Sequence, residues 1–71
     1  MDGRIKLNSL SLKKLRKLNG LSQEKLAELC RRKRLSISIS SIKRAETGKW
    51  VLYRTAGALA LFYQVTIDEL S

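Results

Sequence analysis

Apolar residues recur at intervals of three and four along most of this chain, and that spacing restricts the fold more than any other feature. The spacing places the side chains of each group along one side of a helix. We therefore predict an all-α fold with helices at about Ser9–Asn19, from Ser22 onward, and at about Thr55–Gln64. The spaced residues are Leu12, Leu15 and Leu18, then Leu26, Leu29 and Cys30, then Ala56, Leu59, Ala60 and Tyr63.

Residues that cap helices stand at the ends of these stretches. Asn19-Gly20 is typical of a helix C-terminus, because glycine readily adopts the left-handed conformation there. Ser22 can accept a hydrogen bond from the free N–H groups of a helix that follows it. The sequence T-x-x-E from Thr66 to Glu69 is a capping box and predicts a final short helical turn.

The length and the cysteine and histidine counts exclude several classes of protein. Seventy-one residues form one domain with a small core. Cys30 is the only cysteine and there is no histidine, so an intramolecular disulfide and the usual zinc-finger patterns are excluded. Cys30 lies on an apolar helix side and is predicted to fill the core. Without an acid-base pair or a metal cluster, we predict no enzyme, no metal and no cofactor.

Positive charge is concentrated in one part of the chain. The net charge is +9, and all 15 Lys and Arg residues lie between Arg4 and Arg54. A cationic field of this kind favours nucleic acid as a partner, with an anionic membrane surface as the second candidate. No apolar run approaches a membrane span and no signal peptide is present, so the sequence predicts a cytoplasmic protein that does not enter a membrane.

The stretch Ser36–Lys49 is the candidate DNA-contacting element. Its serines can cap a helix, Ile42 and Ala45 lie on one side, and Gly48 can end the helix. The other side carries hydroxyls and cations, which bond base edges and phosphates in a DNA major groove. The residues on that side are Ser40, Ser41, Lys43 and Arg44.

A β-strand is the alternative for part of this stretch. Leu35–Ile39 alternates apolar and polar residues strictly, and Arg4–Leu7 could pair with it. The alternation ends at Ser40-Ser41, and an isolated two-stranded sheet is marginal in water. We therefore favour the helix.

Three other segments have two interpretations each. Met1–Asn8 is a lead-in that could be an arm or a frayed strand. Arg31–Arg34 could be a solvated loop or could straddle a phosphate backbone. Lys49–Arg54 is predicted as a loop, in which Trp50 and Tyr53 either contact sugar and phosphate or, as we favour, pack in the core or partly buried over it.

Three sequence motifs together resemble the XRE type of phage-repressor and Cro-like helix-turn-helix domains. They are Leu21-Ser22-Gln23-Glu24-x-Leu26-Ala27-Glu28-Leu29, then Ile42-x-x-x-Glu46-x-Gly48-Lys49, then Val65-x-Ile67-Asp68-Glu69-Leu70. The resemblance implies a five-helix, lambda-repressor-like bundle whose second and third helices contact DNA. It also implies one domain over residues 9–71 after a lead-in over 1–8, and a bacterial regulator of which this is the N-terminal part.

The resemblance carries site residues over position by position. Gln23 is similar to the glutamine that bonds a phosphate and braces the recognition helix. The base-facing positions, within a recognition helix at about 38–47, are Ile39, Ser40, Lys43 and Arg44. The positions that grip the backbone are Thr47, Lys49 and Arg54.

The chain departs from the family pattern at three points. About five extra residues separate the second and third helices, which predicts an extended turn. Ile39 replaces a residue that is often polar, so it either contacts a thymine methyl or is buried. Gln64 stands where glycine often ends the fourth helix, which predicts strain in its backbone.

The function that the sequence favours is sequence-specific binding of double-stranded DNA for transcriptional regulation. A homodimer formed through parts of a longer parent chain would place two such domains on two half-sites. The alternative is a protein-interaction module of the same fold that binds an acidic partner.

Overall fold

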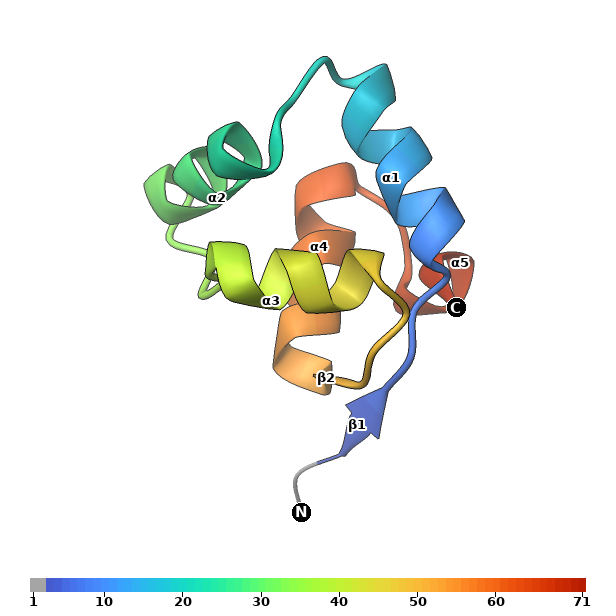
Figure 1. The fold of residues 1–71 in the computed structure, drawn as a ribbon. Helices are drawn as coiled ribbons and strands as arrows, with labels where there is room; N and C mark the ends of the chain where they lie inside the picture. The colour runs from blue at the N-terminus through green and yellow to red at the C-terminus, as the bar shows by residue number, and fades with distance from the viewer. Residues whose placement is uncertain (1–2) are drawn as a thin grey trace.

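The fold is a small helical bundle with a two-stranded β-sheet at one end, as the computed structural model shows for residues 3–71 (Figure 1). Met1 and Asp2, the first residues of the predicted lead-in, lie outside the described residues. The helical bundle confirms the predicted all-α, lambda-repressor-like fold class, and the two-stranded sheet is an addition to that prediction. In chain order the elements are β1 (Arg4–Ile5), α1 (Ser9–Leu18), α2 (Gln23–Arg32), α3 (Ile39–Glu46), β2 (Val51–Leu52), α4 (Tyr53–Tyr63) and α5 (Ile67–Leu70).

One hydrophobic core joins these elements. It is formed mainly by leucine and alanine from the inner sides of the helices, and Cys30 fills part of it with no exposed surface. The spacing predicted most of these residues, but Leu18, which it placed on the buried side of the first helix, is 73 % exposed. Leu35 and Ile37, from the turn between α2 and α3, pack against the core. The buried members are Leu7, Leu12, Leu26, Cys30, Ile42, Ala45, Val51, Ala56, Leu59, Ala60 and Leu70.

The lead-in forms a strand, but its partner is not the one considered from the sequence. β1 pairs antiparallel with β2, so that Arg4 lies opposite Leu52 and Ile5 opposite Val51. Residues 35–38 form no strand, and the alternative pairing is wrong. Their alternation arises because the extended turn directs Leu35 and Ile37 inward and leaves Ser36 and Ser38 exposed.

The segment Lys49–Arg54 is not a plain loop, which corrects the prediction. It contains β2 and the first turn of α4, which begins about two residues earlier than expected. The N-cap Leu52 supplies no side-chain hydrogen bond, but the Tyr53 N–H donates to the Gly3 carbonyl at 3.2 Å. Backbone from the lead-in therefore satisfies one of the free N–H groups at the start of α4.

Trp50 and Tyr53 do not belong to the core, so the expectation of core packing is wrong and only partial burial is present. Trp50 is 52 % exposed and Tyr53 is 50 % exposed. Both contact the lead-in: the Lys6 Nζ lies 5.2 Å from the Trp50 ring centroid, and the Tyr53 ring lies so close to Gly3 that a Cβ there would come within 2.7 Å. These aromatic rings cover the N-terminal segment rather than the helices.

The four longer helices all end in the same way. Each is followed by a residue with positive φ, namely Gly20, Arg34, Gly48 and Gln64. At each end, the next N–H donates to a carbonyl in the last turn, as Leu35 does to Cys30 at 2.8 Å and Val65 to Ala60 at 2.9 Å. This is the Schellman arrangement. It confirms the predicted roles of Gly20 and Gly48, and it places the end of the Arg31–Arg34 run in a helix cap.

Replacing Gln64 by glycine should stabilise the protein. Gln64 has φ 59° and ψ 45°, a conformation that costs a residue with a Cβ about 1–2 kcal/mol. Glycine avoids that cost but gives up about 0.4–1 kcal/mol through its freer unfolded chain, so we expect a net gain of about 0.5–1 kcal/mol. Urea unfolding measures it. The control Gln64→Ala keeps the Cβ and should give no gain in stability. A loss of stability in Gln64→Gly would show that the backbone of Gln64 is not strained.

Candidate nucleic-acid interface

The outer face of α3 is a stripe of hydroxyls and cations. The spacing i, i+3, i+4 and i+7 brings these side chains onto one side of the helix, and all of them are exposed. The opposite side of α3 is buried and carries Ile42, Ala45 and Glu46. The residues of this outer face of α3 are Ser40, Lys43, Arg44 and Thr47.

Local hydrogen bonds define both ends of α3. The Ser38 Oγ accepts from the Ser41 N–H at 3.2 Å and caps the N-terminus, as predicted for a serine in this stretch. At the C-terminus, the Thr47 hydroxyl donates to the carbonyls of Lys43 at 2.9 Å and Arg44 at 3.1 Å. α3 is therefore capped at both ends, and its outer face is free of packing contacts with the core.

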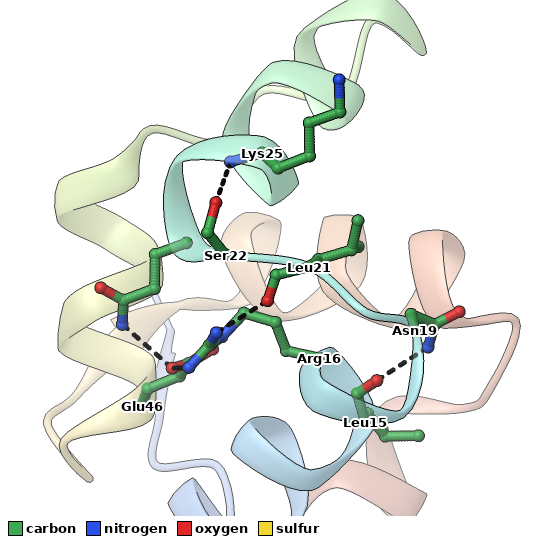
Figure 2. A network of polar contacts seen from close by, with 8 residues as sticks. Leu15, Arg16, Asn19, Leu21, Ser22, Lys25 and Glu46 are labelled. Atoms are coloured by element: carbon green, nitrogen blue, oxygen red, sulfur yellow. Dashed lines mark hydrogen bonds and ion pairs between the residues drawn. The ribbon is translucent and has the colours of Figure 1, made fainter.

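A buried ion pair fixes α3 against α1 and α2. Arg16 of α1 donates to Glu46 of α3 through two nitrogens, Nε to Oε2 at 2.8 Å and Nη2 to Oε1 at 3.0 Å. Figure 2 shows this guanidinium between the Glu46 carboxylate and the Leu21 carbonyl, to which Nη1 donates at 2.9 Å. Glu46 is 2 % exposed. The pair thus holds the C-terminal end of α3 from the inner side of the bundle.

Gln23 completes the network from the start of α2. Its Nε2 donates to Glu46 Oε1 at 3.0 Å. The brace that the family resemblance implied for Gln23 is therefore present. It acts on the C-terminal end of α3, where Glu46 lies. The phosphate contact implied for Gln23 stays a prediction.

The other predicted site residues lie around the same helix. Lys49 follows α3 and Arg54 lies in the first turn of α4, and both are exposed. Ile39 is half-buried, but it is not among the side chains of residues 3–71 that pack against the core. The Arg44 Nη2 donates to the Trp50 carbonyl at 3.1 Å, which directs part of its guanidinium toward β2.

The chain matches a family model described as helix-turn-helix over residues 12–70 of its 71 residues. It belongs to the XRE-type helix-turn-helix family. Comparisons with curated proteins and with solved structures gave no significant match. The family is one of DNA-binding domains, so α2, the turn over residues 33–38 and α3 form a DNA-binding helix-turn-helix.

The turn of this helix-turn-helix is extended, as predicted, and the structure shows how it is built. Arg34 takes a left-handed conformation at φ 60°, after which the chain runs on to the Ser38 cap. Leu35 and Ile37 attach the turn to the core. α2 and α3 are therefore held together by burial as well as by Gln23.

Two residues to which the sequence assigned no role are Arg16 of α1 and Glu46 of α3. In the sequence, Arg16 stands among the lysines of the first helix without a distinguishing pattern, and Glu46 enters only as part of the family motif. An acidic residue one position before a Thr-Gly helix end, on the buried side of an otherwise cationic helix, was the available signal. It could not identify Arg16, which is 30 residues away, as its partner.

Buried polar groups near this network have shifted pKa values. The hydrogen bonding of Arg16 to the Glu46 carboxylate, in which the guanidinium donates, raises the pKa of Arg16 and keeps it charged. Burial, and then the Glu46 charge, raises the pKa of Tyr63 to about 12. Burial also raises the pKa of Cys30, so this thiol stays protonated at neutral pH and behaves as a core residue.

Within residues 3–71, no helix is long and apolar enough to cross a membrane.

Proposed function

We propose that this protein binds double-stranded DNA in a sequence-dependent way and thereby regulates transcription, with α3 in the major groove. The observation that carries the proposal is the outer face of α3: it is exposed and cationic, and it is fixed from behind by the buried Arg16–Glu46 pair. A helix of this kind can place side chains on base edges without first having to become ordered.

Affinity and specificity would come from different residues. Ser40 and Lys43 lie on the exposed side of α3, where hydroxyl and ammonium groups can bond base edges at about 1–3 kcal/mol per good contact. Lys49 and Arg54 flank α3 and would neutralise phosphates, which makes the affinity depend steeply on salt. A second copy on an adjacent half-site would add affinity.

The test is selection of bound duplexes from a random DNA pool, followed by titration of the selected duplex and a scrambled one at several salt concentrations. We expect a defined sequence motif whose advantage over the scrambled duplex persists as salt rises, because base contacts are less sensitive to salt than phosphate contacts. Equal binding of both duplexes that disappears together with salt would contradict the proposal.

A protein-interaction role is the second candidate, and the outer side of α1 favours it. Leu10 is 75 % exposed and Leu18 is 73 % exposed, and the two border a hollow of about 420 Å³. The lysines between the two leucines would attract the acidic side chains of an amphipathic partner segment, and the leucines would contact its apolar side. Binding of DNA by charge alone, in the experiment above, is the result that would favour this role. The remaining residues of the hollow are Lys13, Lys14 and Lys17.

A further inference from the structure

Strand β1 adds the positive charge of Arg4 next to α3, and it lies outside the residues that match the family model. The match to the family model begins at residue 12 of this chain, whereas β1 spans Arg4–Ile5. Pairing with β2, which follows α3 closely in the chain, brings β1 to the end of α3 that leads into β2. Figure 1 shows β1 and β2 together near the N-terminus, beside the chain that connects α3 to α4.

A polar hollow lies between this sheet and α3. Its volume is about 410 Å³, and it is lined by Arg4, Ser41, Arg44, Trp50 and Thr55 together with the β2 residues. Two arginines and two residues with hydroxyl groups thus line one space, and no acidic residue among residues 3–71 lines it. Arginine, with its planar set of N–H donors, is well suited to hold a phosphate in such a space.

Contacts between the sheet and α3 fix the lining in place. Arg44 donates to the Trp50 carbonyl at 3.1 Å, and the Lys6 ammonium lies 5.2 Å from the centroid of the Trp50 ring. The Arg4 backbone is held by its pairing with Leu52. Since a guanidinium has five N–H donors, Arg44 keeps donors for a ligand after it has bonded Trp50.

The geometry points to a phosphate site in this polar hollow, which takes a backbone phosphate of the same duplex that α3 contacts, with Arg4 and Arg44 as donors. The inference rests on the proposed function. Ser41 and Arg44 belong both to α3 and to the hollow, so a duplex that receives α3 in its major groove passes one strand over the hollow. β1 therefore extends the DNA interface beyond the helix-turn-helix.

The first test compares Arg4→Gln with the control Lys17→Gln. Both variants remove one positive charge, but Lys17 lies on the outer side of α1, away from the polar hollow. Arg4→Gln should weaken binding of every duplex roughly tenfold and lower the salt slope by about 1, with the preferred sequence unchanged. Lys17→Gln should weaken binding much less. Arg4→Lys should recover part of the loss, and thermal unfolding of each variant shows whether the fold is kept. Equal losses for Arg4→Gln and Lys17→Gln would overturn the site.

The second test identifies the phosphate. Duplexes that carry a neutral methylphosphonate at one backbone position at a time are titrated with the original protein and with Arg4→Gln. At one position the substitution should weaken binding of the original protein but not of Arg4→Gln, because the contact is then already lost. If no position shows this coupling, or if inorganic phosphate alone saturates the hollow without competing with the duplex, the assignment to the DNA backbone is wrong. Failure of the original protein to prefer any duplex would instead overturn the proposed function.

Discussion

Glu46→Gln should lower the free energy of unfolding by about 3 kcal/mol, the largest single effect that we expect in this protein. The amide cannot neutralise Arg16, whose side chain is only 13 % exposed and would stay charged without a partner. Breaking a buried ion pair from one side costs about 3–5 kcal/mol, and the remaining exposure of Arg16 places this case at the lower end. Urea denaturation of the two proteins measures the difference.

Glu28→Gln is the matched control for this prediction. Glu28 also pairs with two cations, Lys25 at 3.4 Å and Arg32 at 2.8 Å, but it does so at the surface. The nearby Lys25 lowers the pKa of Glu28, yet solvent screens exposed pairs of this kind, and their loss has little effect on stability. Equal losses in Glu46→Gln and Glu28→Gln would show that the Arg16–Glu46 pair does not fix α3.

A second substitution separates lost charge compensation from lost packing. Adding Arg16→Met to Glu46→Gln removes the unpaired charge and keeps an apolar side chain of similar length. We expect the double variant to be more stable than Glu46→Gln alone, because a buried pair replaced on both sides leaves no orphan charge. A double variant that is less stable by the sum of two independent losses would indicate that packing dominates.

Lys43→Ala should weaken binding to the preferred duplex by about 1–3 kcal/mol and relax the preference at one base position. Lys43 is the cation of the outer face of α3 that is best placed for this test, because Arg44 already bonds the Trp50 carbonyl. Duplex selection with the variant, followed by titration against single-base changes, measures both effects.

Lys49→Ala is the companion to Lys43→Ala and should behave differently. Lys49 lies beyond the end of α3 and is exposed, where a phosphate contact would carry no base information. Its loss should weaken all duplexes alike and lower the salt slope by about 1. If Lys43→Ala also weakened all sequences equally, the outer face of α3 would be a backbone contact and another element would have to discriminate bases.

Much of the helical part of this protein could be predicted because its signals are local. Three- and four-residue spacing gave α1, α2 and α4 their buried sides, and Ser22 and the Thr66–Glu69 box start their helices as predicted. Each of these features depends on residues within about one or two helical turns of one another, so a reader of the sequence has all the interacting groups in view.

The remaining features depend on residues that are distant in the sequence. Alternation at Leu35–Ile39 suggested a strand, but residues 35–38 form a turn, Ile39 begins α3, and Arg4–Ile5 pairs with Val51–Leu52 instead. The same pairing draws Trp50 and Tyr53 to the surface over the lead-in and brings Arg4 to the polar hollow.

The partnership of Arg16 with Glu46 is the clearest case, because the position of Glu46 marks one partner in the sequence but nothing there identifies Arg16 as the other. Only the packing of α1 against α3 removes both from water, and that burial makes an ordinary charge pair the support of α3. The amino-acid pattern was thus sufficient for the helices and for the chemistry on the outer face of α3. Which distant groups meet, and how deeply they are buried, was settled by the way the helices and the sheet pack together.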